Sequence, residues 1–210
     1  HAPNDLRSIQ AQLQTLAAYP ASHPVARVPV GETALIKQYL DVGFQTLLIP
    51  MVDTAEQAAR IVGAMHYPPR GFRGDGAAIA RASRWGQVAD YMDNASAQLC
   101  CLVQAETTAA LSNLEAIANT DGVDGVFFGP ADLSASMGHP GNADHPDVQK
   151  AIFDGIAVVR RAGKAAGIIT TQREAAQAYL TAGARFVAVG ADSISLMQSA
   201  RALRADFPGG

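Results

Sequence analysis

The sequence predicts an α/β fold on a parallel sheet, of the TIM (β/α)8 barrel type. Three observations predict it. Short β-branched runs alternate with amphipathic helical patterns. The runs are strongly apolar, as buried parallel strands are. Glycines close several helices just before the next strand. We therefore expect residues 1–210 to form one barrel domain with one substantial core.

The elements follow in a regular order along the chain. A first helix is expected from Leu6 to Leu16, where apolar residues recur at helical spacing after a capping Asn4 or Asp5. Strands are expected at 24–30, 46–52, 98–106, 123–129, 165–170 and 185–190. Further helices are expected at 32–42, 54–66, 108–119, 146–162, 172–182 and 193–207.

Residues at the helix ends agree with this order. Thr54 precedes Gln57, and Thr171 precedes Glu174, at the spacing of a capping box. Pro146 stands where a first helical residue is expected. The residues expected just past helix C-termini are Gly43, Gly163 and Gly183.

The number of repeats distinguishes a barrel from an open sheet. Six strand–helix units are two strands short of an eightfold barrel, which typically has about 250 residues. The chain begins with a helix start and has no initiator Met, so we expect two strands and one helix to precede His1. A doubly wound sheet would need no further strands, but no strand is followed by the Gly-rich turn of a dinucleotide site.

Composition excludes some classes of partner. The formal charge is −3 and the arginines are scattered, so a nucleic-acid-binding surface is not expected. Cys100 and Cys101 are neighbours that point to opposite faces of a strand, which predicts free thiols and a reducing cytoplasm. No apolar stretch is long enough to span a membrane, and no secretory signal is present.

Glu106 ends the third expected strand, and alternation places it on one face with Gln104 and Leu102. A buried Gln and Glu need partners. In a parallel barrel the C-terminal strand ends carry the chemistry, so Glu106 is a candidate metal ligand. The alternative is that Glu106 caps the helix that begins near Thr107.

Asp132 follows the fourth expected strand, after a tight turn made by Gly129, Pro130 and Ala131. Capping is again the alternative role. Two carboxylates at adjacent strand ends are, however, a plausible site for a hard cation such as Mg²⁺, with water and substrate oxygens completing the coordination. The backbone N–H groups near Ala131 and Asp132 would bind a substrate carboxylate.

Three further residues are candidates for catalysis. Arg27 is the single guanidinium in an apolar strand, where it either reaches solvent or faces a developing oxyanion. Asp41 lies near a helix C-terminus, where negative charge is disfavoured, so it needs a partner such as a histidine. His1 begins the loop that leads into the first helix, and by its position alone it indicates little.

Together these runs resemble the HpcH/HpaI family of class II pyruvate aldolases, typified by 4-hydroxy-2-oxoheptanedioate aldolase. The resemblance covers essentially the whole chain. Its main motifs are YPPRGFRG at 67–74, QAET at 104–107 and GPADLS at 129–134. The runs ARASRW at 80–85 and VAVG at 187–190 fit as well.

The resemblance implies that Glu106 and Asp132 bind Mg²⁺, Mn²⁺ or Co²⁺, and that the metal chelates pyruvate. It implies that Arg27 stabilises the enolate and that Gln104 orients a metal-bound water. His1 matches the family's catalytic histidine, paired with an aspartate at the position of Asp41. The pocket for pyruvate is expected along Gly129, Pro130 and Ala131. The resemblance further implies a homo-oligomer, a hexamer of swapped dimers in which a neighbour completes each site.

The chain departs from the family pattern at two places. Related sequences have Asp-Gly-Glu before the histidine, whereas this chain begins at His1. Asp75 stands where related sequences commonly have valine. We expect the Gly-rich loop to fold over the mouth of the barrel, so that Asp75 contacts the aldehyde. Arg73 in the same loop could meet the carboxylate of an aldehyde such as succinate semialdehyde.

The expected reaction is cleavage of a 4-hydroxy-2-oxo acid, such as 4-hydroxy-2-oxoheptanedioate in aromatic catabolism, to pyruvate and an aldehyde. A divalent metal and Arg27 would stabilise the enolate. The base that removes the 4-hydroxyl proton is either metal-bound water or His1 tuned by Asp41. An alternative substrate is a 2-keto-3-deoxy-sugar acid of the rhamnonate type.

Three other functions are less well supported. A Schiff-base aldolase needs a lysine in the mouth. Lys37 and Lys150 fall within helices, and Lys164 precedes a strand on the opposite face. Chemistry on phosphoenolpyruvate or an acyl-CoA would keep the metal pair, but no P-loop pattern is present. A barrel that binds a small molecule without catalysis is the third, and it would not bind a divalent metal.

Overall fold

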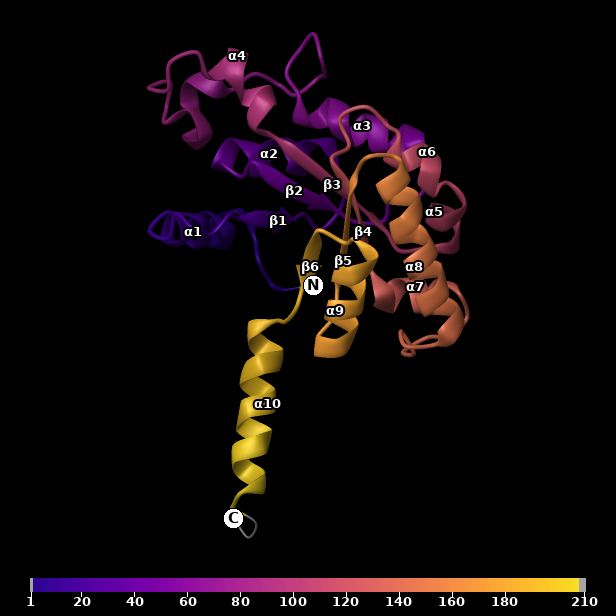
Figure 1. Cartoon of the computed structure of the whole chain (residues 1–210). Coiled ribbons are helices and arrows are strands. Elements are labelled where there is room, and N and C mark those ends of the chain that lie inside the picture. The colour runs from indigo at the N-terminus through magenta and orange to yellow at the C-terminus, as the bar shows by residue number, and fades with distance from the viewer. Residues whose placement is uncertain (1, 208–210) are drawn as a thin grey trace.

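The computed structural model describes residues 2–207, and its centre is a parallel sheet of six strands covered by helices (Figure 1). The strands are β1 Val25–Arg27, β2 Thr46–Ile49, β3 Cys100–Ala105, β4 Gly125–Phe128, β5 Ala165–Ile169 and β6 Phe186–Ala188. The longer helices are α1 Leu6–Leu16, α2 Thr33–Val42, α3 Ala55–Met65, α8 Pro146–Arg161, α9 Arg173–Ala182 and α10 Asp192–Ala205. All six expected strands are present, each shorter than expected.

The strands lie side by side in the order of the chain, from β1 to β6, and every neighbouring pair is parallel. A doubly wound sheet reverses its strand order near the middle, so this singly wound order excludes it for the described residues. The sheet curls as the strands of a barrel do. Within residues 2–207, β1 and β6 are not paired with each other, so the sheet is a half-barrel and eightfold closure stays a prediction.

The two faces of the curled sheet have different surroundings. The outer face packs against helices and carries the main core, which includes Ile49, Val103 and Ile168. The inner face carries a small apolar cluster of Leu48, Leu102 and Phe127. Because side chains alternate along a strand, β2, β3 and β4 contribute buried residues to both clusters. Cys101 belongs to the outer core while Cys100 packs against the inner cluster, and both are free thiols.

The helix boundaries confirm most of the expected signals and correct two. Asp5 caps α1, and Thr54 with Gln57 forms the expected capping box of α3. The capping box expected at Thr171 is wrong: α9 begins after Gln172, whose backbone N–H donates to the Thr170 hydroxyl. The single helix expected at 108–119 is also wrong, because it divides at Asn113 into α5 Thr108–Ser112 and α6 Leu114–Ala118.

One region contains elements that the sequence pattern did not predict. Between the helix expected at 54–66 and the strand expected at 98–106 lie α4 Tyr91–Ala95 and three short 3-10 turns, η1 Ala77–Ile79, η2 Arg81–Ser83 and η3 Ser96–Gln98. The short helix α7 Pro130–Ser136 follows β4. Helix α10 projects from the rest of the chain and has no buried residue (Figure 1). Within residues 2–207 no helix has the length and apolar character needed to cross a bilayer.

Candidate active site

A pocket of about 420 Å³ lies on the inner face of the sheet, toward the C-terminal ends of the strands. The strand register explains its composition. Gln104, Phe127, Gly167 and Phe186 are register partners and share one row across the sheet. Glu106, two residues after Gln104 and just past the end of β3, also lines the pocket. The predicted residues that line this pocket are Arg27, Gln104, Glu106, Gly129, Pro130, Ala131 and Asp132.

A chain of hydrogen bonds joins three of these side chains. The Arg27 Nε donates to Gln104 Oε1 at 2.9 Å. The Gln104 Nε2 donates to Glu106 Oε2 at 3.0 Å. Gln104 is 7% exposed, so its amide needs partners, and both of its ends have one. Arg27 lines the pocket, and its bond to Gln104 uses the Nε donor, not those of the two Nη groups.

Glu106 is only 1% exposed, and the backbone around it is shaped to hold its carboxylate. Its Oε1 accepts a hydrogen bond of 2.9 Å from the backbone N–H of Met51. Met51 has a left-handed φ of 56°, which is strained for a residue with a side chain. Burial raises the pKa of Glu106, the Met51 N–H opposes that shift, and the negative charge of Asp132 adds to it.

Gly129 and helix α7 complete the carboxylate pair. A Cβ at Gly129 would lie 2.3 Å from Glu106 Oε2, so only glycine leaves room for this carboxylate. Gly129 precedes α7, and Pro130 is the first residue of that helix, as the tight turn predicted. Asp132 lies in the first turn of α7 and is exposed to the pocket opening.

This donor set fits a hard divalent cation. Burial and the negative charge of Asp132 raise the pKa of Glu106, and a cation between the two carboxylates in this apolar-walled pocket would offset that cost. Oxygen ligands of this kind suit Mg²⁺ or Mn²⁺, with remaining positions for water and substrate. A carboxylate oxygen accepts more than one contact, so the bonds from Met51 and Gln104 leave lone pairs free.

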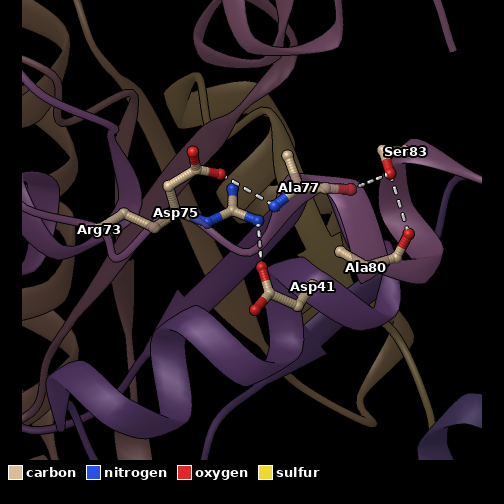
Figure 2. A network of polar contacts seen from close by, with 6 residues as sticks. All are labelled: Asp41, Arg73, Asp75, Ala77, Ala80 and Ser83. Carbon is tan, nitrogen blue, oxygen red and sulfur yellow. Dashed lines mark hydrogen bonds and ion pairs between the residues drawn. The ribbon is translucent and has the colours of Figure 1, made fainter. Parts of the chain in front are cut away.

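Asp41 and Asp75 are not among the residues that line this pocket. Asp41, in the last turn of α2, accepts a hydrogen bond of 2.6 Å from Arg73 Nη2, as Figure 2 shows. Within residues 2–207, the Arg73 guanidinium is therefore the partner of the Asp41 carboxylate. Asp75 is exposed, and its Oδ1 accepts from the Ala77 N–H at 3.0 Å, which forms a local turn.

The structure corrects the expectation for Arg73 in the Gly-rich loop, while the role of Asp75 stays a prediction. Arg73 cannot meet a substrate carboxylate, because its side chain is 0% exposed and stacks 4.4 Å from the centre of the Tyr67 ring. Asp75 does not line the pocket of its own chain. The topology explains why Asp41 and its partner Arg73 lie away from the pocket. Helix α2 ends just before β2 begins, so Asp41 lies at the edge of the sheet where the strands start, whereas Glu106 lies at the edge where they end. His1 lies outside the described residues.

The lysines are where the sequence predicted them. Lys37 is in α2 and Lys150 is in α8, where it pairs with Asp154 at 2.5 Å. The Lys164 Nζ donates to the Val123 carbonyl before β5 begins, at the other edge of the sheet. Within residues 2–207, no lysine is among the side chains that line the pocket described above.

Sequence reasoning missed two aromatic residues that line the pocket and the residue whose backbone N–H binds Glu106. Phe127 and Phe186, whose ring centroids are 5.3 Å apart, form its apolar floor, and strand alternation counted from Gln104 would have found Phe127. Met51 was also missed. No sequence signal marks a methionine for a left-handed conformation, because that preference belongs to glycine and asparagine.

Comparison with known proteins identifies the family of this chain. Residues 1–199 match the profile of the HpcH/HpaI aldolase/citrate lyase family. A hydroxypyruvate/pyruvate aldolase of Pseudomonas aeruginosa is 59% identical over 210 residues, which are 100% of this chain and 78% of that protein. A 4-hydroxy-2-oxo-heptane-1,7-dioate aldolase of Klebsiella pneumoniae is 55% identical over 207 residues, 99% of this chain and 78% of that protein.

A solved structure agrees with the sequence relatives. The crystal structure of a family protein from Burkholderia cenocepacia superposes with a TM-score of 0.94 at 40% identity, covering 98% of this chain and 82% of that one. The match spans the sheet, the pocket and the helices around them. This chain belongs to the HpcH/HpaI aldolase/citrate lyase family.

Proposed function

We propose that this chain is a metal-dependent class II aldolase that cleaves 4-hydroxy-2-oxo acids reversibly to pyruvate and an aldehyde. One observation carries the proposal: Arg27, Gln104, Glu106 and Asp132 share one lysine-free pocket at the C-terminal edge of the sheet. The names of whole-chain relatives as aldolases support carbon–carbon lyase chemistry.

The residues divide the work of binding and catalysis. Glu106 and Asp132 would hold the divalent cation, which supplies Lewis-acid stabilisation of negative charge on the substrate's 2-oxo oxygen. Gly129, Pro130 and Ala131 line the place for the pyruvate moiety. The backbone N–H groups of Ala131 and Asp132 are in the first turn of α7, where they have no intrahelical acceptor, and would receive the substrate carboxylate.

Cleavage moves the electron pair of the C3–C4 bond onto the pyruvate fragment, while the 4-hydroxyl group loses its proton to a base. Arg27 stabilises the enolate oxygen by charge, and its Nε bond to Gln104 fixes the guanidinium for that role. Protonation of C3 of the enolate then gives pyruvate. Phe127 and Phe186 keep that side of the pocket apolar, which strengthens the charge interactions within it.

The aldehyde and the donor are proposed from the relatives' names and from Asp75. The name of the heptanedioate aldolase supports succinate semialdehyde as the aldehyde for this chain. The name of the hydroxypyruvate/pyruvate aldolase supports hydroxypyruvate as a second donor. A 2-keto-3-deoxy-sugar acid of the rhamnonate type is the alternative, because the carboxylate of Asp75 can accept hydrogen bonds from a hydroxylated aldehyde.

Assembly is part of the proposal. Helix α10 has exposed apolar side chains, including Leu196 at 74% and Leu203 at 62%, and such a helix is expected to pack against another surface. We expect swapped dimers in a hexamer, in which Asp41 and Asp75 face the site of a neighbouring copy. Two more strands between β6 and β1 would pair both free edges and close an eightfold barrel. The free thiols suit a reducing cytoplasm.

The test is an aldol assay with purified protein, pyruvate or hydroxypyruvate, and a panel of aldehydes, with and without a chelator. We expect carbon–carbon bond formation that requires a divalent metal, with succinate semialdehyde or a hydroxyaldehyde as acceptor. No product with any aldehyde in the presence of Mg²⁺, Mn²⁺ or Co²⁺ would contradict the proposal.

A further inference from the structure

A second cluster of possible metal ligands lies outside the pocket, where the loop after α7 meets the start of α8. His139, His145 and Asp147 each present one ligand atom, and these atoms all lie within 4.8 Å of one another. The His139 Nε2 is 4.0 Å from Asp147 Oδ2, and the His145 Nδ1 is 3.8 Å from the same oxygen. The two imidazole rings are stacked, with centroids 3.5 Å apart.

We propose that His139, His145 and Asp147 form a binding site for a divalent transition-metal ion of the Zn²⁺ class. Two imidazoles and one carboxylate are a ligand set that zinc uses in proteins, with water in the fourth position. Mg²⁺ prefers oxygen ligands, so this site and the Glu106–Asp132 pair differ in the ions they select.

The separations are close to those of a bound ion. At usual zinc–ligand lengths, tetrahedral geometry sets neighbouring nitrogen and oxygen ligands about 3.4 Å apart. The observed gaps of 3.8 and 4.0 Å to the Asp147 oxygen therefore need to shorten by about half an ångström, and the two histidine nitrogens, which lie within 4.8 Å of each other, need to approach as well. The side chains of His139 and His145 are partly exposed, at 29% and 30%. The His145 Nδ1 accepts a hydrogen bond of 3.2 Å from the Asp147 backbone N–H, so a metal ion would replace that contact, and the two stacked rings would turn toward the ion.

The backbone already holds the loop in place. The His139 N–H donates to the Ser134 carbonyl of α7, and the His145 N–H donates to the Asn142 carbonyl. The Gln149 side chain in α8 donates to the Ala143 carbonyl. The ligands therefore come from an ordered segment, and less conformational entropy is lost when an ion binds. A bound ion would fasten residues 139–145 to the first turn of α8.

The test is titration of metal-free protein with Zn²⁺ by calorimetry in the presence of excess Mg²⁺, with Co²⁺ as a spectroscopic probe. We expect one zinc site in the parent chain that weakens at least tenfold in both His139→Ala and His145→Ala. His23→Ala removes an exposed histidine that bonds Thr46 and serves as the matched control. Glu106→Gln should keep this zinc site while it loses the proposed catalytic metal, which separates the two proposals.

Hydrogen exchange gives an independent measurement. Zn²⁺ should slow amide exchange at residues 139–147 in the parent and in His23→Ala, and should leave it unchanged in His139→Ala. Zinc affinity that survives both cluster substitutions, or that disappears in Glu106→Gln alone, would overturn the assignment.

Discussion

Gly129 and Glu106, on adjacent strand ends, occupy complementary space: a Cβ on the glycine would stand 2.3 Å from the Oε2 of the glutamate. Glu106 is 1% exposed, and the Met51 N–H and the Gln104 Nε2 hold its carboxylate in this position by hydrogen bonds. Because Gly129 has no Cβ, the Glu106 carboxylate can occupy its position on the pocket lining.

Gly129→Ala is expected to displace Glu106 and weaken binding of the divalent metal about 10- to 100-fold, the effect typical of losing support around a ligand. Titration of the variant with Mn²⁺ measures this. Gly74→Ala is the control, because its added methyl would meet nothing closer than Lys37 at 3.8 Å. Unchanged Mn²⁺ affinity in Gly129→Ala would mean that Glu106 is not a ligand.

Arg27→Ala is expected to lower kcat about 10²- to 10³-fold, since a donor to a developing oxyanion acts more in the transition state than in substrate binding. Arg27→Lys should recover only part of this loss, because an ammonium group cannot both bond Gln104 and face the substrate as the guanidinium does. Exchange of the pyruvate methyl protons should fall in parallel. If exchange proceeds at the parent rate in Arg27→Ala, Arg27 has a structural role only.

Asp41→Ala is expected to lower the free energy of unfolding by about 3 kcal/mol, because it leaves the buried Arg73 charge without its partner. Arg73→Met should cost less, since the Asp41 side chain is 25% exposed and water can solvate it. Urea unfolding at one fixed protein concentration compares the two variants. A larger loss in Arg73→Met than in Asp41→Ala contradicts this asymmetry.

Asp75→Val is expected to raise the kcat/KM ratio of succinate semialdehyde to a hydroxyaldehyde, because removal of the carboxylate ends its repulsion of an anionic aldehyde. Asp75→Asn keeps an oxygen acceptor for the Ala77 N–H and removes only the charge, so it should shift the ratio in the same direction. Since Asp75 lies away from its own pocket, this effect also requires a neighbouring copy. If both variants keep the parent's kcat/KM ratio, Asp75 does not contact the aldehyde.

Much of the fold could be predicted because local signals agreed with one another. Thr54, Gln57 and Pro146 mark helix starts by their own chemistry, and alternation along β3 placed Gln104 and Glu106 on the inner face correctly. The register of parallel strands then brings those side chains together without further information.

The remainder depended on contacts between distant segments. Asn113 divides a continuous helical pattern, and its side chain donates to the Asp53 carbonyl, 60 residues earlier. The pairing of Asp41 with Arg73 joins a helix end to a loop 32 residues away, which no local pattern encodes. The role assigned to His1 rests on the family resemblance, the role assigned to Asp75 rests on its place in the Gly-rich loop, and both stay predictions.

The most direct test of the metal-dependent mechanism is the rate of 4-hydroxy-2-oxo acid cleavage by chelator-treated protein, before and after Mg²⁺, Mn²⁺ or Co²⁺ is restored. The parent chain should lose activity on chelation and regain it with metal. Glu106→Gln and Asp132→Asn should need metal concentrations at least tenfold higher. Cleavage at the parent rate by Glu106→Gln in metal-free buffer would contradict the proposed site.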